Sequence, residues 1–231
     1  NELESVAAFA KKHLVFLDSM VDRIVSHRDG PNGSLIPRAE PTPPKALVLL
    51  DLDQNLPEWF AKLSQADNNH SSNSHGLVVR NTESQLQADV TLKLCIANAT
   101  HTAAAHLLAL LGIVNTAALA STSDVSSLSL HLLDRLVQDQ ILPATASSTI
   151  STTQIQQAWV DWKVRLTHPT FGLSTFFITQ NGAAKGGIRW GPTLYNLLAQ
   201  EEPNVTASLA FCFAVLLRWL TPGTERTERN G

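Results

Sequence analysis

Apolar residues recur every three or four positions along most of this chain, which is the spacing of an amphipathic helix. Residues 2–13 show it first, and from residue 84 onward almost every longer segment has the same periodicity without the alternation of a strand. Together with stops at glycine or proline, the pattern predicts helices over these later ranges: 84–111, 126–142, 153–167, 171–180, 193–201 and 205–220.

The N-terminal third of the chain has a different pattern. An extended stretch over residues 15–25 leads into a loop rich in proline and glycine. Two short apolar runs, 46–51 and 76–80, predict buried strands, with Asp51 at the end of the first. A short helix and a polar loop lie between them. The predicted fold class is therefore mainly α, preceded by an α/β segment.

A glycine-rich run, residues 182–189, follows one of the predicted helices. It does not have the Gly-x-Gly-x-x-Gly spacing of a dinucleotide-binding fingerprint, and it does not match a P-loop. No such fingerprint occurs elsewhere in the sequence. We therefore predict a turn over residues 182–189.

Composition and charge indicate a folded protein that does not bind nucleic acid. The 231 residues suffice for one or two domains, and 44% apolar with 16% charged residues disfavours disorder. The net charge is −3, from 17 Lys and Arg against 20 Asp and Glu. No basic run is present that could follow a phosphate backbone, so nucleic acid is not an expected partner.

Both cysteines, Cys95 and Cys212, lie in apolar helical patterns rather than at disulfide or zinc spacings. They predict reduced, packed thiols in a cytoplasmic protein and exclude a cysteine-ligated metal site. The longest apolar stretches, 103–120 and 207–220, contain polar interruptions and do not reach the roughly 20 clean residues of a bilayer span. We expect buried helices there and no membrane association.

Three polar residues interrupt the apolar helix predicted over 84–111: Lys93, Asn98 and His101. At about 100° per residue they fall within an arc of roughly 140°, so one face can present all three. On a regular helix Lys93 and His101 lie about 12 Å apart along the axis, so they converge only on an elongated ligand or where the helix is distorted. Alternatively, the lysine reaches solvent while the other two bond to neighbouring helices.

The spacing Lys93-x4-Asn98-x2-His101 resembles the signature of the mannitol dehydrogenase family, the polyol-specific long-chain dehydrogenases, which includes the fructuronate reductases. Four further segments resemble motifs of this family, in the same order along the chain: Asp18-Ser-Met-Val-Asp-Arg-Ile24, Leu49-Leu-Asp51, Arg165-Leu-Thr-His-Pro169 and Asn181-Gly-Ala-Ala-Lys185. A helical scaffold unrelated to dehydrogenases would require five coincidences.

The resemblance implies a Rossmann-type nucleotide domain followed by a mainly helical domain. Residues 1–76 would be the C-terminal remnant of the nucleotide-binding domain, and residues 77–231 the helical substrate domain, truncated at its C-terminus. The implied activity is that of an oxidoreductase: metal-independent hydride transfer between NAD or NADP and a secondary alcohol of a polyol, ketose or sugar acid. The cofactor site would lie largely outside this chain.

The resemblance also implies roles for individual residues. Lys93 would be the general acid/base, Asn98 would donate to the developing alkoxide, and His101 would orient a substrate oxygen. The substrate-binding residues that the other motifs imply are Asp18, Asp51, Arg165 and Lys185.

Two features depart from the family pattern. Asp18 stands where the family has an asparagine that donates to the oxyanion, and the dinucleotide fingerprint is missing. They leave open a second hypothesis, a catalytically inactive fragment or relic that serves as a helical interaction or structural module. The retained Lys93, Asn98 and His101 favour the enzyme.

We expect Asp18→Asn to raise activity or to shift the pH optimum upward, because it removes a carboxylate that can donate a hydrogen bond only when protonated. The measurement is the pH–rate profile of polyol oxidation by a chain that includes a nucleotide domain. An unchanged rate and profile would place Asp18 outside the active site.

Overall fold

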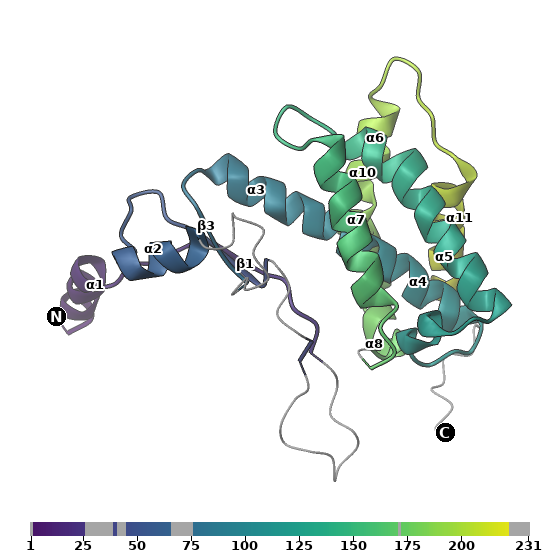
Figure 1. Ribbon diagram of the computed structural model, residues 1–231, viewed down its shortest axis with the longest axis horizontal. Helices are drawn as coiled ribbons and strands as arrows, with labels where there is room; N and C mark the ends of the chain where they lie inside the picture. The colour runs from purple at the N-terminus through teal and green to yellow at the C-terminus, as the bar shows by residue number, and fades with distance from the viewer. Residues whose placement is uncertain (1, 26–38, 41–44, 66–75, 171, 222–231) are drawn as a thin grey trace, which may run out of the picture. The chain divides into compact units, whose positions relative to one another are not determined.

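The computed structural model describes residues 2–25, 39–40, 45–65, 76–170 and 172–221. The chain forms two compact units (Figure 1): unit 1 comprises residues 1–23 and 41–89, and unit 2 comprises residues 24–40 and 90–231. The polar loop predicted at residues 67–75 lies outside the described residues. The assignment of residues 1–76 to a nucleotide-binding remnant stays a prediction.

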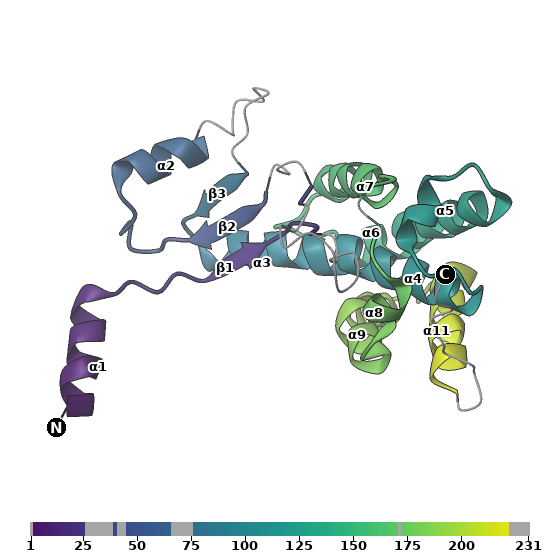
Figure 2. The ribbon, with the colours of Figure 1, turned by 90° about the horizontal axis from the view of Figure 1, so that it is seen from below.

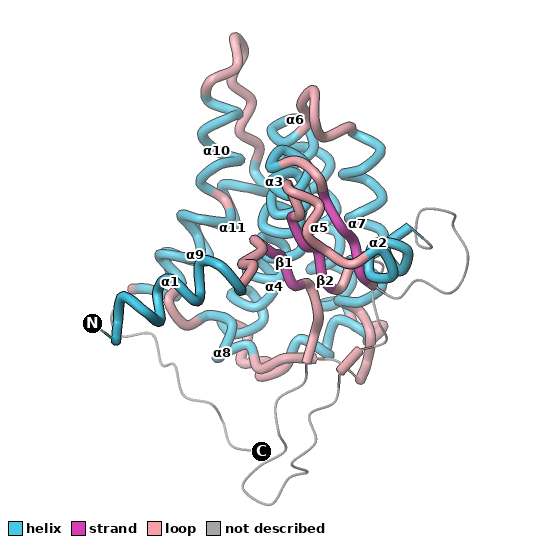
Figure 3. Tube along the Cα trace, turned by 90° about the vertical axis from the view of Figure 1, so that its left-hand side faces the viewer, coloured by secondary structure: helices cyan, strands magenta, loops and turns pink. Residues whose placement is uncertain are grey.

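Unit 1 contains a small mixed sheet in the order β1-β2-β3. Strand β1 (Ser19–Val21) pairs antiparallel with β2 (Leu47–Leu50), and β2 pairs in parallel with β3 (Leu77–Arg80). Figure 3 shows β1 and β2 side by side. Val48 and Leu50 of β2 are buried and alternate with partly exposed residues, as expected of a strand with one covered face. The helices of unit 1 are α1 (Glu2–His13), α2 (Glu58–Gln65) and most of α3 (Glu83–Leu92).

One buried carboxylate joins this sheet to α3. Asp89 is 4% exposed and pairs with Arg80 Nε at 2.7 Å and with Lys45 Nζ at 2.5 Å. Arg80 ends β3 and Lys45 precedes β2, so a single side chain ties both strands to the helix. The two cations compensate the cost of burying the charge.

Unit 2 is built from helices around α4 (Ala99–Leu110), which Figure 2 shows between α7 on one side and α8 and α9 on the other. Ala99, Ala105 and Leu108 of α4 have no exposed surface, and the small alanines let neighbouring helices approach closely. The other helices are η2 (Lys93–Asn98), η3 (Thr116–Ala120), α5 (Asp124–Leu136), η4 (Val137–Ile141), α6 (Leu142–Thr145), α7 (Thr152–Leu166), α8 (Thr175–Thr179), α9 (Gly182–Arg189), α10 (Gly191–Leu198) and α11 (Ala207–Leu220).

The prediction that a helix ends at Pro143 is wrong, because the chain stays helical through η4 and α6 to Thr145. Proline interrupts an α-helix because it cannot donate to the carbonyl four residues back, which here is that of Asp139. The Gln140 side-chain amide donates to this carbonyl at 2.7 Å instead. The π-helical turn η4 and this side-chain donor together accommodate the proline.

The predicted packed thiols are confirmed, since Cys95 and Cys212 are both buried and unbridged. Burial raises the pKa of the Cys212 thiol to about 12 and also raises the pKa of Cys95. None of the helices in the described ranges combines the length and the hydropathy that a bilayer span requires.

The prediction of a turn over residues 182–189 is also wrong, because these residues form helix α9. Two of its glycines lie against other helices: a Cβ on Gly182 would come within 2.9 Å of His106 Nε2, and one on Gly186 within 2.6 Å of Leu216 Cδ2. The glycines therefore serve close helix packing, and this tertiary contact outweighs their low helix propensity.

We expect Gly182→Ala to destabilise the protein by about 1–3 kcal/mol, because the new methyl group meets the rigid, buried imidazole of His106. Gly187 is the matched control on the same helix, since a Cβ there meets nothing within 4 Å. Gly187→Ala should stabilise by roughly 0.5–1 kcal/mol through higher helix propensity. Urea unfolding of both variants checks the pair, and equal effects would contradict the packing role of Gly182.

Candidate active site

The helix that carries Lys93 and Asn98 is distorted at that point. Residues Lys93–Asn98 form the π-helical turn η2, in which hydrogen bonds join residues five apart instead of four. A wider turn brings residues five apart close to one face, whereas on an α-helix they are separated by about 140°. His101 follows Asn98 by three residues on α4. From this helical geometry we expect Lys93, Asn98 and His101 to lie nearer to one face than they would on a regular α-helix.

Asn98 sits at the junction of η2 and α4 with a half-buried side chain. Its carbonyl accepts from Thr102 Oγ1 at 2.8 Å and from Arg189 Nη1 at 3.4 Å. Its side-chain amide makes no hydrogen bond to another described residue. The backbone is thus held from two sides while the amide group can serve a ligand. Lys93, one π turn earlier, is also half-buried.

His101 is a neutral imidazole at physiological pH. Burial, then the positive charges of Arg189 and Lys185, lower its pKa to about 4. The edge of its ring packs on Trp162, with 5.6 Å between centroids. A neutral ring has one nitrogen that donates and one that accepts, so it can orient a hydroxyl group.

Trp162 holds this region to helix α7. Its Nε1 donates to Thr100 Oγ1 at 2.9 Å, and the Thr100 hydroxyl donates to the Ile96 carbonyl of η2 at 2.6 Å. The Arg165 guanidinium lies over the indole, 5.1 Å from its centroid. Trp162 is therefore fixed at its nitrogen and on its face, and it offers His101 a rigid surface.

Arg165, a predicted substrate ligand, makes an internal ion pair. Its Nε and Nη2 donate to the carboxylate of Glu40 at 2.8 and 2.6 Å. Glu40 is 4% exposed and also accepts from the Ile24 backbone N–H at 2.6 Å. This bidentate pair engages the edge of the guanidinium that best matches a carboxylate. The role of Arg165 in binding substrate stays a prediction.

The two predicted aspartates belong to unit 1, whereas the other predicted site residues belong to unit 2. Asp51 is buried at the end of β2, and its carboxylate accepts from the backbone N–H groups of Asn55 at 2.8 Å and Leu56 at 3.0 Å. It therefore stabilises the turn that follows the strand. Asp18 is exposed, and its carbonyl accepts from the Leu50 N–H. Their contact with substrate stays a prediction.

Helix α9 carries two cations, Lys185 and Arg189, which bond to different neighbours. Lys185 Nζ donates to the Ile178 carbonyl at 2.7 Å, and Arg189 Nη1 donates to the Asn98 carbonyl and the Thr102 hydroxyl. Sequence reasoning found Lys185 and missed Arg189. The missed signal is their four-residue spacing, which has meaning only if residues 182–189 are helical.

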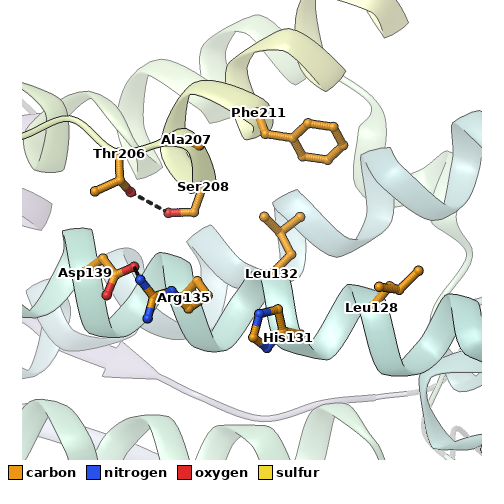
Figure 4. A pocket seen from close by; sticks show the side chains of 9 residues that line it. All are labelled: Leu128, His131, Leu132, Arg135, Asp139, Thr206, Ala207, Ser208 and Phe211. Atoms are coloured by element: carbon orange, nitrogen blue, oxygen red, sulfur yellow. Dashed lines mark hydrogen bonds and ion pairs between the residues drawn. The ribbon is translucent and has the colours of Figure 1, made fainter.

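A separate groove lies between α5 and the start of α11 (Figure 4), with a volume of about 420 Å³. Arg135 pairs there with Asp139 at 2.7 Å, and the hydroxyls of Thr206 and Ser208 are 2.9 Å apart. None of the predicted site residues lines this groove.

No protein-family model matches the sequence, and no curated protein does either. Among solved structures, the chain is similar to a D-sorbitol dehydrogenase in substrate-free form, with a TM-score of 0.64 and 16% identity over 94% of this chain and 42% of that one. It is also similar to Pseudomonas fluorescens mannitol 2-dehydrogenase in a ternary complex with NAD and D-mannitol, with a TM-score of 0.63 and 17% identity over 94% of this chain and 41% of that one.

These similarities establish the fold. At 16–17% identity they carry no further assignment, and the chain spans well under half the length of either dehydrogenase. The mainly α fold class and the resemblance in fold to mannitol dehydrogenase are confirmed. The chain therefore has the fold of the corresponding part of the polyol dehydrogenases.

The low pKa of His101 predicts a loss of stability in acid. A histidine in the unfolded chain has its usual pKa of 6.5, whereas the pKa of His101 in the folded chain is about 4. Between pH 6.5 and pH 4 the unfolded chain therefore binds a proton at His101 that the folded chain does not bind, and the free energy of unfolding falls as the pH drops. We expect His101 to account for a loss on the order of 2 kcal/mol. Urea unfolding of wild type and His101→Gln at pH 7 and pH 4 measures it.

The exposed His131 supplies the control, because His131→Gln should keep the acid sensitivity of the wild type. If His101→Gln is as acid-sensitive as the wild type, burial and the charges of α9 do not lower the pKa of His101 as described.

Proposed function

We propose that this chain is the substrate-binding part of an oxidoreductase that transfers a hydride between NAD or NADP and a secondary alcohol of a polyol or sugar acid. The observation that carries the proposal is the π-helical turn η2 at Lys93–Asn98, because the geometry of such a turn brings residues five apart toward one face. The fold shared with a sorbitol and a mannitol dehydrogenase supports it. The two buried thiols fit a cytoplasmic location.

In the proposed reaction, Lys93 takes the hydroxyl proton as the alcohol is oxidised and returns it in the reverse direction. The Asn98 amide donates to the oxygen as negative charge develops on it. Neutral His101 orients a substrate oxygen through one ring nitrogen, and Trp162 keeps the ring in place. These roles require no metal ion.

The nicotinamide would accept the hydride, but the described residues do not fit a dinucleotide. The glycine-rich run forms α9, and its Gly182 and Gly186 are buried against His106 and Leu216 instead of cradling a phosphate. We therefore assign no described residue of this chain to the cofactor.

A second candidate is a helical interaction or structural module without catalysis. Two observations favour it, since Asp51 stabilises a turn and Arg165 pairs with buried Glu40. The intact mass of the protein from its source cells separates the candidates. A mass far above 25.1 kDa leaves room for a nucleotide domain, and a mass at that value favours the module.

We expect Lys93→Ala to lower the rate of NAD(P)H-linked ketose reduction by about 100-fold or more, because general acid/base catalysis contributes at least that factor. Cofactor affinity should stay unchanged. Lys62→Ala is the control, since Lys62 is exposed on α2 and pairs only with Glu58 among the described residues. The assay uses the intact protein from its source cells, and normal turnover by Lys93→Ala would refute the assignment.

A further inference from the structure

A cavity of about 490 Å³ lies in unit 2, where α6 and the segment after it meet α10. Its volume is in the range of pockets that bind small ligands. Thr91 and Cys95 line it from α3 and η2. None of Lys93, Asn98 and His101 lines it. The cavity is therefore separate from the candidate active site.

The cavity wall contains a buried hydroxyl group without a hydrogen bond. Thr193 of α10 is 2% exposed, and its Oγ1 has no partner in the described part of the chain. By contrast, the buried Thr116 hydroxyl accepts from the Leu173 N–H at 2.9 Å, and that of Thr175 donates to the Ile113 carbonyl at 2.8 Å. An unpaired buried polar group costs free energy, which a ligand recovers by bonding to it. Thr193 therefore indicates a ligand at this wall.

Two carboxamide groups that line the cavity have unused acceptors. Asn196 and Gln200 lie three and seven residues after Thr193, the spacing of one side of a helix. Asn196 Nδ2 donates to the Ala144 carbonyl at 2.9 Å, and Gln200 Nε2 donates to the Pro143 carbonyl at 3.4 Å. Among the described residues, neither side-chain oxygen accepts a hydrogen bond. The nitrogens are thus used on α6, and the oxygens can accept from a ligand.

The lining of the cavity is polar but uncharged. It combines hydroxyl and carboxamide groups with proline and alanine, and none of the described residues in it is Asp, Glu, Lys, Arg or His. An ion would lose hydration there without gaining a counter-charge. The amide oxygens require donors, and a hydroxyl group can bond to another hydroxyl in either direction. The matching ligand is therefore neutral and carries several hydroxyl groups.

We propose that this cavity is a second ligand site that binds a neutral sugar in its ring form through Thr193, Asn196 and Gln200. A sugar ring carries hydroxyls at its rim and C–H groups on its faces, and the faces match the apolar side chains of Pro192 and Ile150. The inference goes beyond the proposed function, because hydride transfer uses none of these residues.

The test uses methyl α-D-glucoside, whose locked ring cannot open to a carbonyl form that a reductase would accept. Its fully O-methylated derivative lacks O–H donors, and methyl α-D-glucuronide carries a carboxylate. Isothermal titration calorimetry on the intact protein should give about ten-fold tighter binding of the glucoside than of either comparison ligand. A glucoside that does not bind, or binds no tighter than either of them, would overturn the site.

Thr193→Val should weaken the glucoside about ten-fold, because a methyl group replaces the hydroxyl. It should not lower the free energy of unfolding in urea, since no described partner is lost. Thr116→Val is the matched control: it should lower that free energy, because the Leu173 N–H loses its acceptor, and should bind the glucoside as the wild type does. Equal losses of stability in the two variants, or unchanged binding by Thr193→Val, would overturn the role of Thr193.

A blocking variant tests the location without removing a polar group. Ala199 is exposed and lines the cavity, so Ala199→Phe should fill it and abolish binding of the glucoside. Leu198→Phe is the control, since the exposed Leu198 is outside the lining. Binding that survives Ala199→Phe would refute the assignment to this cavity.

The outcome is separable from that of the proposed function. Lys93→Ala should bind the glucoside as the wild type does while losing turnover, and a loss of binding would place the glucoside in the candidate active site instead. A protein that binds the glucoside in the cavity but reduces no ketose or keto acid would keep the second site and refute the dehydrogenase. A dehydrogenase that does not bind the glucoside would refute the second site alone.

Discussion

Unit 2 depends on how the carbonyl groups at the junction of η2 and α4 are satisfied. A change from π-helical to α-helical bonding disrupts the regular ladder, and buried carbonyls without donors are costly. Side chains supply donors here: the Thr100 hydroxyl bonds to the Ile96 carbonyl, Arg189 reaches that of Asn98, and Trp190 Nε1 donates to that of Ala99 at 3.1 Å. Arg189 at the end of α9 and Trp190, the next residue, are thereby hydrogen-bonded to the continuous helical run of η2 and α4.

The same bonds position the candidate site. Trp162 uses its nitrogen on Thr100 and its ring on His101, so α7 and α4 are joined through the residue that supports the imidazole. The Arg165 guanidinium, which Glu40 holds in place, lies over the indole ring of Trp162. A site whose residues are held by packing and hydrogen bonds keeps its geometry without rearrangement when substrate arrives.

Periodicity along the sequence predicted most of the helices of unit 2. The roles of Lys93, Asn98 and His101 came from the resemblance to a dehydrogenase signature, and they stay predictions. Periodicity did not predict α9, since glycines indicate a turn unless a neighbouring helix needs the room. Nor did it show the π turn, or the pairing of Arg165 with Glu40, 125 positions apart in sequence. Arg189 was overlooked because residues 182–189 were predicted to form a turn instead of helix α9.

Packing and electrostatics are coupled through the two glycines of α9. Because Gly182 and Gly186 have no side chains, α9 approaches His106 and Leu216. The charges of Lys185 and Arg189 on this helix then lower the pKa of His101. The Nδ1–H of His106 donates to the Thr102 carbonyl at 2.8 Å, while its Nε2 has no partner in the described part of the chain. Burial is the main cause that lowers the pKa of both histidines, and the two cations of α9 lower it further. A change that moves α9 alters the core and the charge state of the site together.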